Sequence, residues 1–148
     1  MRILVLNGPN LNLLGQRAVD IYGRLSLKDL EARLDEYAVK LNIHVTCQQF
    51  SGEGQLIDSL HDANGWAQGI VLNAGAYSHY SYALRDAVEA ISVPVIEVHL
   101  SNISAREPFR HQSVLTPVCA GCIHGLGALG YELALNALEA LFRTQTSP

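Results

Sequence analysis

The stretch "RILVLNGPN" (residues 2–10) passes from an apolar run straight into a polar segment. A short, continuous apolar run predicts a strand that is buried on both faces, as in a parallel sheet. The pattern returns in "GIVLNAG" (69–75) and "PVIEVHL" (94–100), and helical patterns separate the three runs. This alternation predicts parallel βαβ units in one open sheet.

The remaining elements complete a five-stranded α/β domain. We expect helices at 26–42, 53–64, 79–91 and 125–143, and further strands at 43–50 and 114–123. Segment 43–50 largely alternates polar and apolar residues, which indicates a half-exposed edge strand. This favours a flavodoxin-like three-layer sandwich with the parallel strand order 2-1-3-4-5.

Composition limits the classes of function. The 148 residues carry a net charge of -4, with 49% hydrophobic and 16% charged residues. We therefore expect a single domain over residues 1–148, with no nucleic-acid partner and no membrane partner. Three cysteines in a chain without an evident signal peptide fit a reducing, cytoplasmic location. The low charge also hints that other copies of the chain cover part of the surface.

Polar side chains gather after the first, third and fourth strands. Because parallel strands end at one edge, these groups should converge on a single crevice, where such sheets bind ligands. They are Asn7, Asn10, Asn12, Asn73, Ser78, His79, His99, Ser101 and Asn102, followed by Arg106 and Arg110.

Several kinds of chemistry are disfavoured. The two lysines, Lys28 and Lys40, lie on the charged face of helix 26–42, which argues against imine catalysis. No histidine and cysteine set has zinc-ligand spacing. The motif "GLGALG" (125–130) is interpreted as helix–sheet packing instead of dinucleotide binding, because no acidic ribose-binding residue follows. The motif "CAGC" (119–122), placed inside the fifth strand, is interpreted as buried thiols.

An acid and a base can be suggested from the residues. Glu97 lies two residues before His99 on one strand face, where it would favour the charged imidazole and suit it to donate a proton. Arg17 and Arg24 flank Tyr22 in a long loop, and guanidinium charge favours an ionised phenol. The alternatives are a hydrogen-bonded core histidine and a tyrosine that anchors the loop.

Four segments, in this order and spacing, resemble the type II 3-dehydroquinate dehydratase family: "LNGPNLNLLG…R…YG", "LNAGAYSHYSYALRDA", "IEVHLSN" and "REPFRHQS". The resemblance covers essentially the whole chain. It implies a lyase without a cofactor that reversibly dehydrates 3-dehydroquinate to 3-dehydroshikimate, in the shikimate pathway or in quinate catabolism. It also implies a homododecamer built from trimers and an active-site lid at about residues 15–24.

The resemblance also assigns roles to residues. Tyr22 would be the base, Arg17 would activate it and steady the enolate, and His99 would be the acid with Glu97 behind it. Asn10 would hold the water that stabilises the enolate. The substrate would be bound by Asn73, His79, Leu100, Ser101 and Arg110, and by Asp86 from a neighbouring subunit.

The chain departs from the family pattern in the lid and near the second strand. The family usually has glutamate and proline where this chain has Ala18 and Val19, and asparagine at the position of Gly52. Lid closure could therefore differ. Two other functions stay open: a flavin- or nucleotide-binding module on the same fold, and a non-catalytic oligomeric relative.

Overall fold

The computed structural model describes residues 1–146 and shows one five-stranded sheet of order β2-β1-β3-β4-β5, which confirms the predicted topology. All paired strands are parallel. The strands are β1 Arg2–Asn7, β2 His44–Gln49, β3 Gly69–Asn73, β4 Val95–His99 and β5 Gly121–His124. The helices are α1 Val19–Tyr22, α2 Leu27–Leu41, α3 Glu53–Ala63, α4 Tyr82–Ala90 and α5 Leu129–Thr146.

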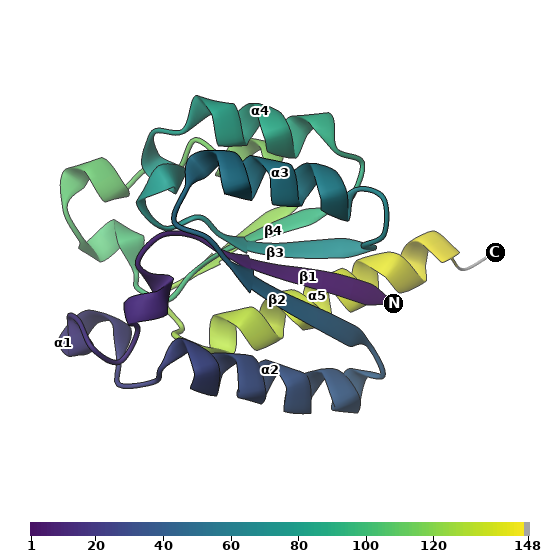
Figure 1. The fold of residues 1–148 in the computed structure, drawn as a ribbon, viewed down its shortest axis with the longest axis horizontal. Helices are drawn as coiled ribbons and strands as arrows, with labels where there is room; N and C mark the ends of the chain where they lie inside the picture. Colours follow the sequence, from purple (N-terminus) through teal and green to yellow (C-terminus); the bar gives the residue numbers. More distant parts are fainter. Residues whose placement is uncertain (147–148) are drawn as a thin grey trace.

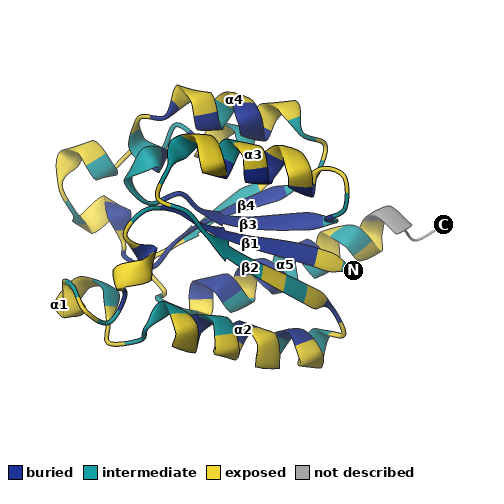
Figure 2. Ribbon diagram, viewed as in Figure 1, coloured by how far each residue is buried: buried dark blue, intermediate teal, exposed yellow. Residues whose placement is uncertain are grey.

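Helices cover both faces of the sheet, with α3 and α4 on one side and α2 and α5 on the other (Figure 1). Each face carries its own apolar core, because the central strands are buried on both sides. Figure 2 shows the buried residues concentrated in β1, β3 and β4 and in the helix faces that contact them. The edge strand β2 is only partly buried, as its alternating sequence predicts.

The fifth strand is shorter than predicted. Residues 114–123 do not form one strand, because Thr116–Val118 forms a 3-10 turn with Pro117 in its first positions. Proline has no N–H to give to a sheet ladder, so the strand starts only at Gly121. Placing "CAGC" inside the strand was therefore wrong, since Cys119 precedes β5 and only Cys122 lies within it.

Helix α4 also starts later than predicted. A 3-10 helix, Gly75–His79, follows β3, and α4 begins at Tyr82 with Ser81 as its N-cap. The Ser81 hydroxyl accepts a hydrogen bond from the backbone N–H of Leu84, which satisfies one donor of the first helical turn. This arrangement leaves His79 at the end of the sheet and not on the helix.

Two glycines of "GLGALG" make a turn, and the third begins helix α5. Gly125 and Gly127 have φ of 87° and 56°, values that L-residues with a side chain rarely adopt. Gly130 opens α5 against β4 and β5, where an added Cβ would lie 3.4 Å from Ile123 and 3.6 Å from Val98. These distances are ordinary van der Waals contacts, so the turn at Gly125 and Gly127 explains the glycines, and tight helix–sheet packing stays a prediction.

A close backbone approach joins the ends of β1 and β3. The N–H of Gly8 donates to the carbonyl of Asn73 at 2.7 Å. A Cβ on Gly8 would lie 2.7 Å from backbone atoms of Ala74, which is closer than real contacts allow. Only glycine fits here, so this residue keeps the two strand ends together beneath the polar crevice.

We predict that Gly8→Ala lowers the free energy of unfolding by about 2 kcal/mol, because backbone atoms must shift to admit the methyl group. Urea unfolding at one fixed protein concentration measures the change. Gly54→Ala is the matched control, since nothing lies within 4 Å of its added Cβ. Its unfolding free energy should rise by less than about 1 kcal/mol. Equal stability of Gly8→Ala and the parent would contradict the packing argument.

Candidate active site

A cavity of about 70 Å³ lies at the carboxyl ends of β1, β3 and β4. Figure 1 shows these strand ends on the same side of the molecule as α1. The cavity brings together nine of the predicted site residues. These are Asn10, Arg17, Tyr22, Asn73, His79, His99, Leu100, Ser101 and Arg110.

The segment 15–24, called the lid here, closes one side of the cavity. It is less irregular than predicted, because it contains the one-turn helix α1. Ala18 precedes this turn with φ of 41° and ψ of 49°, a left-handed conformation that costs a residue with a Cβ about 1–2 kcal/mol. Despite the unusual Ala18 and Val19, both Arg17 and Tyr22 line the cavity.

Two arginines contact Tyr22. The Cζ atom of Arg17 lies 4.7 Å from the centre of the Tyr22 ring, and that of Arg106 lies 5.2 Å from it. Arg106 also donates from Nη1 to the Tyr22 hydroxyl at 2.8 Å and to Ser101 Oγ at 3.2 Å. The Nε of Arg17 is buried without a partner among the described residues, so this donor is available to a ligand.

Arg106 is the residue whose role the sequence did not reveal. Its position after the fourth strand predicted that Arg106 lies at the crevice. Its contact with Tyr22 was not predictable, because 84 residues separate the two in the sequence. The ring Nε2 of His111 donates to the Arg106 carbonyl at 2.8 Å and thereby holds the backbone of this loop. The segment "REPFRHQS" (106–113) therefore holds the Arg106 guanidinium against Tyr22 of the lid.

His99 and Glu97 form the predicted pair. His99 Nε2 donates to Glu97 Oε1 at 2.7 Å, which leaves Nδ1 as the ring nitrogen that can serve a substrate. Glu97 also accepts from the hydroxyls of Ser113, at 2.6 Å, and of Thr116. Burial alone raises the pKa of Glu97, but the three hydrogen bonds outweigh it and hold that pKa below its ordinary value. The carboxylate stays ionised behind the imidazole.

His79 lies beside His99 and makes a different hydrogen bond. Its ring stacks on the His99 ring with centres 5.9 Å apart, and its Nδ1–H donates to the Gln112 carbonyl at 2.8 Å. Burial lowers the pKa of His79, an effect that outweighs the bond to Gln112. A neutral His79 presents Nε2 as an acceptor, which suits a ligand hydroxyl.

The cavity favours an anionic ligand. Three guanidinium groups line it, those of Arg17, Arg106 and Arg110, and none of its lining residues in the described part of the chain is acidic. Arg110 is also paired with Glu107, which is half exposed, at 2.6 Å. Planar guanidinium groups bind carboxylate and phosphate groups through two parallel hydrogen bonds, so a ligand with such a group suits the cavity.

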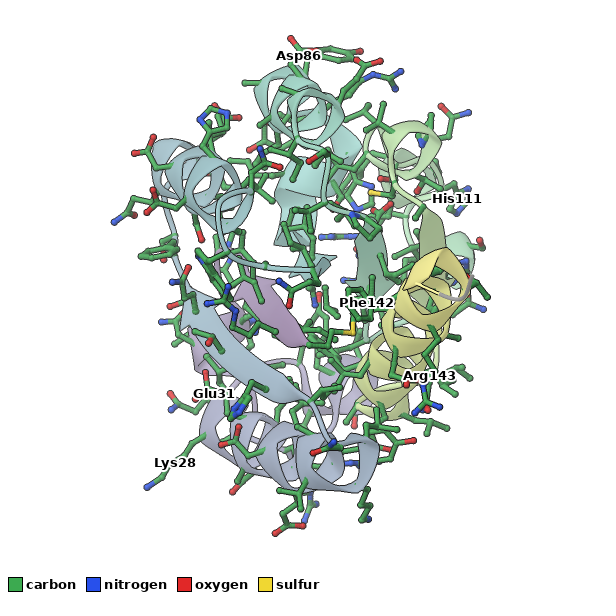
Figure 3. All side chains as sticks on the ribbon, turned by 90° about the vertical axis from the view of Figure 1, so that its right-hand side faces the viewer. Lys28, Glu31, Asp86, His111, Phe142 and Arg143 are labelled. Atoms are coloured by element: carbon green, nitrogen blue, oxygen red, sulfur yellow. The ribbon has the colours of Figure 1, made fainter. Side chains whose placement is uncertain are left out.

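Some predicted residues lie outside the cavity. Asp86 is exposed on α4, where it points outward at the top of Figure 3, and it does not line the chain's own cavity. Lys28 points outward from α2 in the same view. Asn12 and Asn102 are exposed, and Asn102 caps the short turn Ile103–Ala105.

Other kinds of site find no support in the described residues. No group of three or more histidine, cysteine or acidic side chains within residues 1–146 is placed to hold a metal ion. Burial raises the pKa of the thiols of Cys119 to about 12 and of Cys122 to about 11, which makes both poor nucleophiles. No helix in that part of the chain is long and apolar enough to cross a membrane.

We predict that Thr116→Val destabilises the protein by about 1.5 kcal/mol near pH 7, because a charged hydrogen-bond acceptor loses a donor. The pKa of Glu97 is depressed in the folded state, so its stabilisation is present above the ordinary value of 4.5 and is lost as pH falls through the folded value. Removing the hydroxyl moves the folded pKa upward. The stability difference between parent and variant should therefore shrink below about pH 4.5.

Urea unfolding at several pH values checks this, with Thr46→Val on the exposed face of β2 as control. A stability difference that does not change with pH would mean that Thr116 acts through packing and not through Glu97.

Comparison with known proteins places the chain in a family. The family described as "Dehydroquinase class II" matches residues 1–139. A 3-dehydroquinate dehydratase of Halalkalibacterium halodurans is 57% identical over 136 residues, which cover 92% of this chain and 94% of that protein.

Solved structures agree with this. The type II dehydroquinase from Butyrivibrio crossotus has a TM-score of 0.91 at 49% identity, over 93% of this chain and 97% of that one. The type II dehydroquinase from Propionibacterium acnes has a TM-score of 0.91 at 47% identity, over 94% and 96%. The family match, the fold and the cavity that collects the motif residues all point to the same family. The chain belongs to the class II dehydroquinase family.

Proposed function

We propose that the chain catalyses the reversible dehydration of 3-dehydroquinate to 3-dehydroshikimate by an anti elimination through an enolate. The main support is the content of one cavity. It holds a phenol that contacts two guanidinium groups, and it also holds an imidazole that is hydrogen-bonded to a carboxylate. These are opposite electrostatic environments, and they separate a base from an acid. The dehydration belongs to the shikimate pathway, which leads to aromatic amino acids, or runs in quinate catabolism.

Tyr22 is the proposed base. The positive charges of Arg17 and Arg106 favour the phenolate, whose oxygen takes the proton from C2 of the substrate, next to the C3 carbonyl. The electron pair of the C2–H bond moves into the C2–C3 bond and places negative charge on the C3 oxygen. Asn10 lines the cavity and, through a water molecule, stabilises that enolate oxygen.

His99 is the proposed acid. As the enolate collapses, a double bond forms between C1 and C2 and the C1–O bond breaks. The protonated imidazole donates its Nδ1 proton to the departing hydroxyl, which leaves as water. Glu97 stabilises the imidazolium before this step and keeps Nε2 engaged, so the proton leaves from the nitrogen facing the cavity.

The other lining residues bind the substrate. Arg110 and the backbone of Leu100 and Ser101 hold its carboxylate, while Asn73 and His79 accept or donate hydrogen bonds at its hydroxyl groups. No imine is needed, because the enolate is stabilised without a lysine. The proposed reaction uses no flavin, so we expect the purified protein to be colourless.

Assembly is part of the proposal. The open edge of β5 and the neighbouring surface of α5 form an apolar groove, which Ile123, Ala137 and the exposed Leu141 line. Such a surface is typical of contacts between copies. We propose a dodecamer of trimers in which Asp86, which its own cavity does not use, contributes to a neighbouring subunit's site. The free thiols fit a cytoplasmic location.

We predict that Tyr22→Phe abolishes turnover of 3-dehydroquinate and leaves binding of this substrate nearly unchanged, because only the proton acceptor is removed. The ultraviolet absorbance of the conjugated product measures turnover, and calorimetry measures binding to the inactive variant. Borohydride added with substrate should not inactivate the parent, since no imine forms. Near-normal turnover by Tyr22→Phe would rule out this base. A parent that binds FMN and leaves 3-dehydroquinate unchanged would favour a flavin module.

We predict that co-expressed Tyr22→Phe and Asp86→Ala chains complement each other. Each variant alone should be inactive or strongly impaired, whereas random mixed oligomers should recover about a quarter of parent activity, because sites can combine an intact Tyr22 with an intact Asp86 from another chain. Homo-oligomers mixed after assembly are the control. If Asp86→Ala alone is fully active, or if mixed oligomers recover nothing, the cross-subunit role is wrong.

A further inference from the structure

A tyrosine outside the cavity lies directly beneath it. Tyr131, in the first turn of α5, is fully buried. Its hydroxyl donates to Asn7 Oδ1 at 2.7 Å and accepts from Asn73 Nδ2 at 2.8 Å. Asn7 and Asn73 are the last residues of β1 and β3 and are partners in the sheet register. One hydroxyl group thus joins helix α5 to the ends of both strands.

The direction of these hydrogen bonds is determined by a backbone group. The N–H of Gly75 donates at 3.2 Å to the Oδ1 of Asn73, and only the oxygen of that amide can accept. Asn73 must therefore turn its Nδ2 toward Tyr131, whose single proton is then free to reach Asn7. The remaining N–H of Asn73 is left for the cavity, which this residue lines.

Asn7 supports the same direction. Its Nδ2 is buried without a partner among the described residues, although a buried amide donor ordinarily finds one. Turning the Asn7 amide over would point this N–H at a hydroxyl that already accepts from Asn73, and the tyrosine proton would lose its acceptor. Asn7 therefore supplies the acceptor that Tyr131 needs.

We propose that Tyr131 is a positioning residue that holds the amide of Asn73 in the one orientation that presents an N–H to a substrate hydroxyl. A phenylalanine would fill the same space, so the hydroxyl has a purpose beyond packing. Burial raises the pKa of Tyr131, which keeps the group neutral and able to donate and accept at once. The identity of the substrate rests on the proposed function.

The test is a set of kinetic measurements on Tyr131→Phe. KM for 3-dehydroquinate should rise about fivefold to tenfold with little change in kcat, because the lost interaction binds substrate and transition state alike. In an Asn73→Ala background the same substitution should cause no further rise in KM, since its effect passes through Asn73.

Tyr37→Phe is the matched control. The Tyr37 hydroxyl accepts a hydrogen bond from Asn136 in the contact between α2 and α5, away from the cavity. This variant also loses one tyrosine hydrogen bond, but its KM should stay at the parent value. Melting curves of every variant ensure that assays are done where the protein is folded.

A crystal structure of Tyr131→Phe provides a readout that does not need turnover. We expect the Asn73 amide to rotate or to occupy two orientations. An unchanged amide, an unchanged KM, or an equal rise in KM with and without Asn73 would overturn the positioning role. A parent enzyme that does not convert 3-dehydroquinate would instead overturn the proposed function, and the amide orientation would still decide the role of Tyr131.

Discussion

Parallel pairing of β1, β3 and β4 is the constraint on which the site depends. Apart from the exposed Arg2 at the start of β1, these strands are buried on both faces, so their side chains are apolar until the strands end, with Glu97 of β4 as the exception. Most of the polar residues therefore appear at the carboxyl ends, all at one edge and close together. There most of their polar atoms pair with one another, because an unpaired polar group is costly to bury; Asn7 Nδ2 is an exception among the described residues. Asn7, Tyr131 and Asn73 do so in one network, and Glu97, His99, Ser113 and Thr116 do so in another.

The two sides of the cavity have opposite charge environments. Tyr22 lies against two guanidinium groups, whereas His99 lies against a carboxylate that is kept ionised by three donors. Arg17 and Tyr22 come from segment 15–24 and Arg106 from the loop after β4, whereas Glu97 and His99 belong to β4 itself.

The lid keeps its two functional side chains in place despite an unusual sequence. Ala18 adopts a left-handed conformation and Val19 starts a single helical turn, which brings Arg17 and Tyr22 to the same cavity. A left-handed alanine disfavours this arrangement by about 1–2 kcal/mol. The contacts of Tyr22 with Arg17 and Arg106 favour it.

The sequence by itself determined the fold class, the strand order and most of the cavity, because burial pattern and strand ends are local properties. His99 and Glu97 were predictable since residues two apart on a strand share a face. The start of β5 was not predictable, because the apolar pattern of residues 114–123 continues across Pro117, where the chain forms a 3-10 turn. Only the tertiary structure revealed that Arg106 reaches Tyr22 and that Tyr131 joins Asn7 to Asn73, since these partners lie 84, 124 and 58 residues apart. Contacts of this kind are decided by how helices and loops pack on the sheet, which no local pattern records.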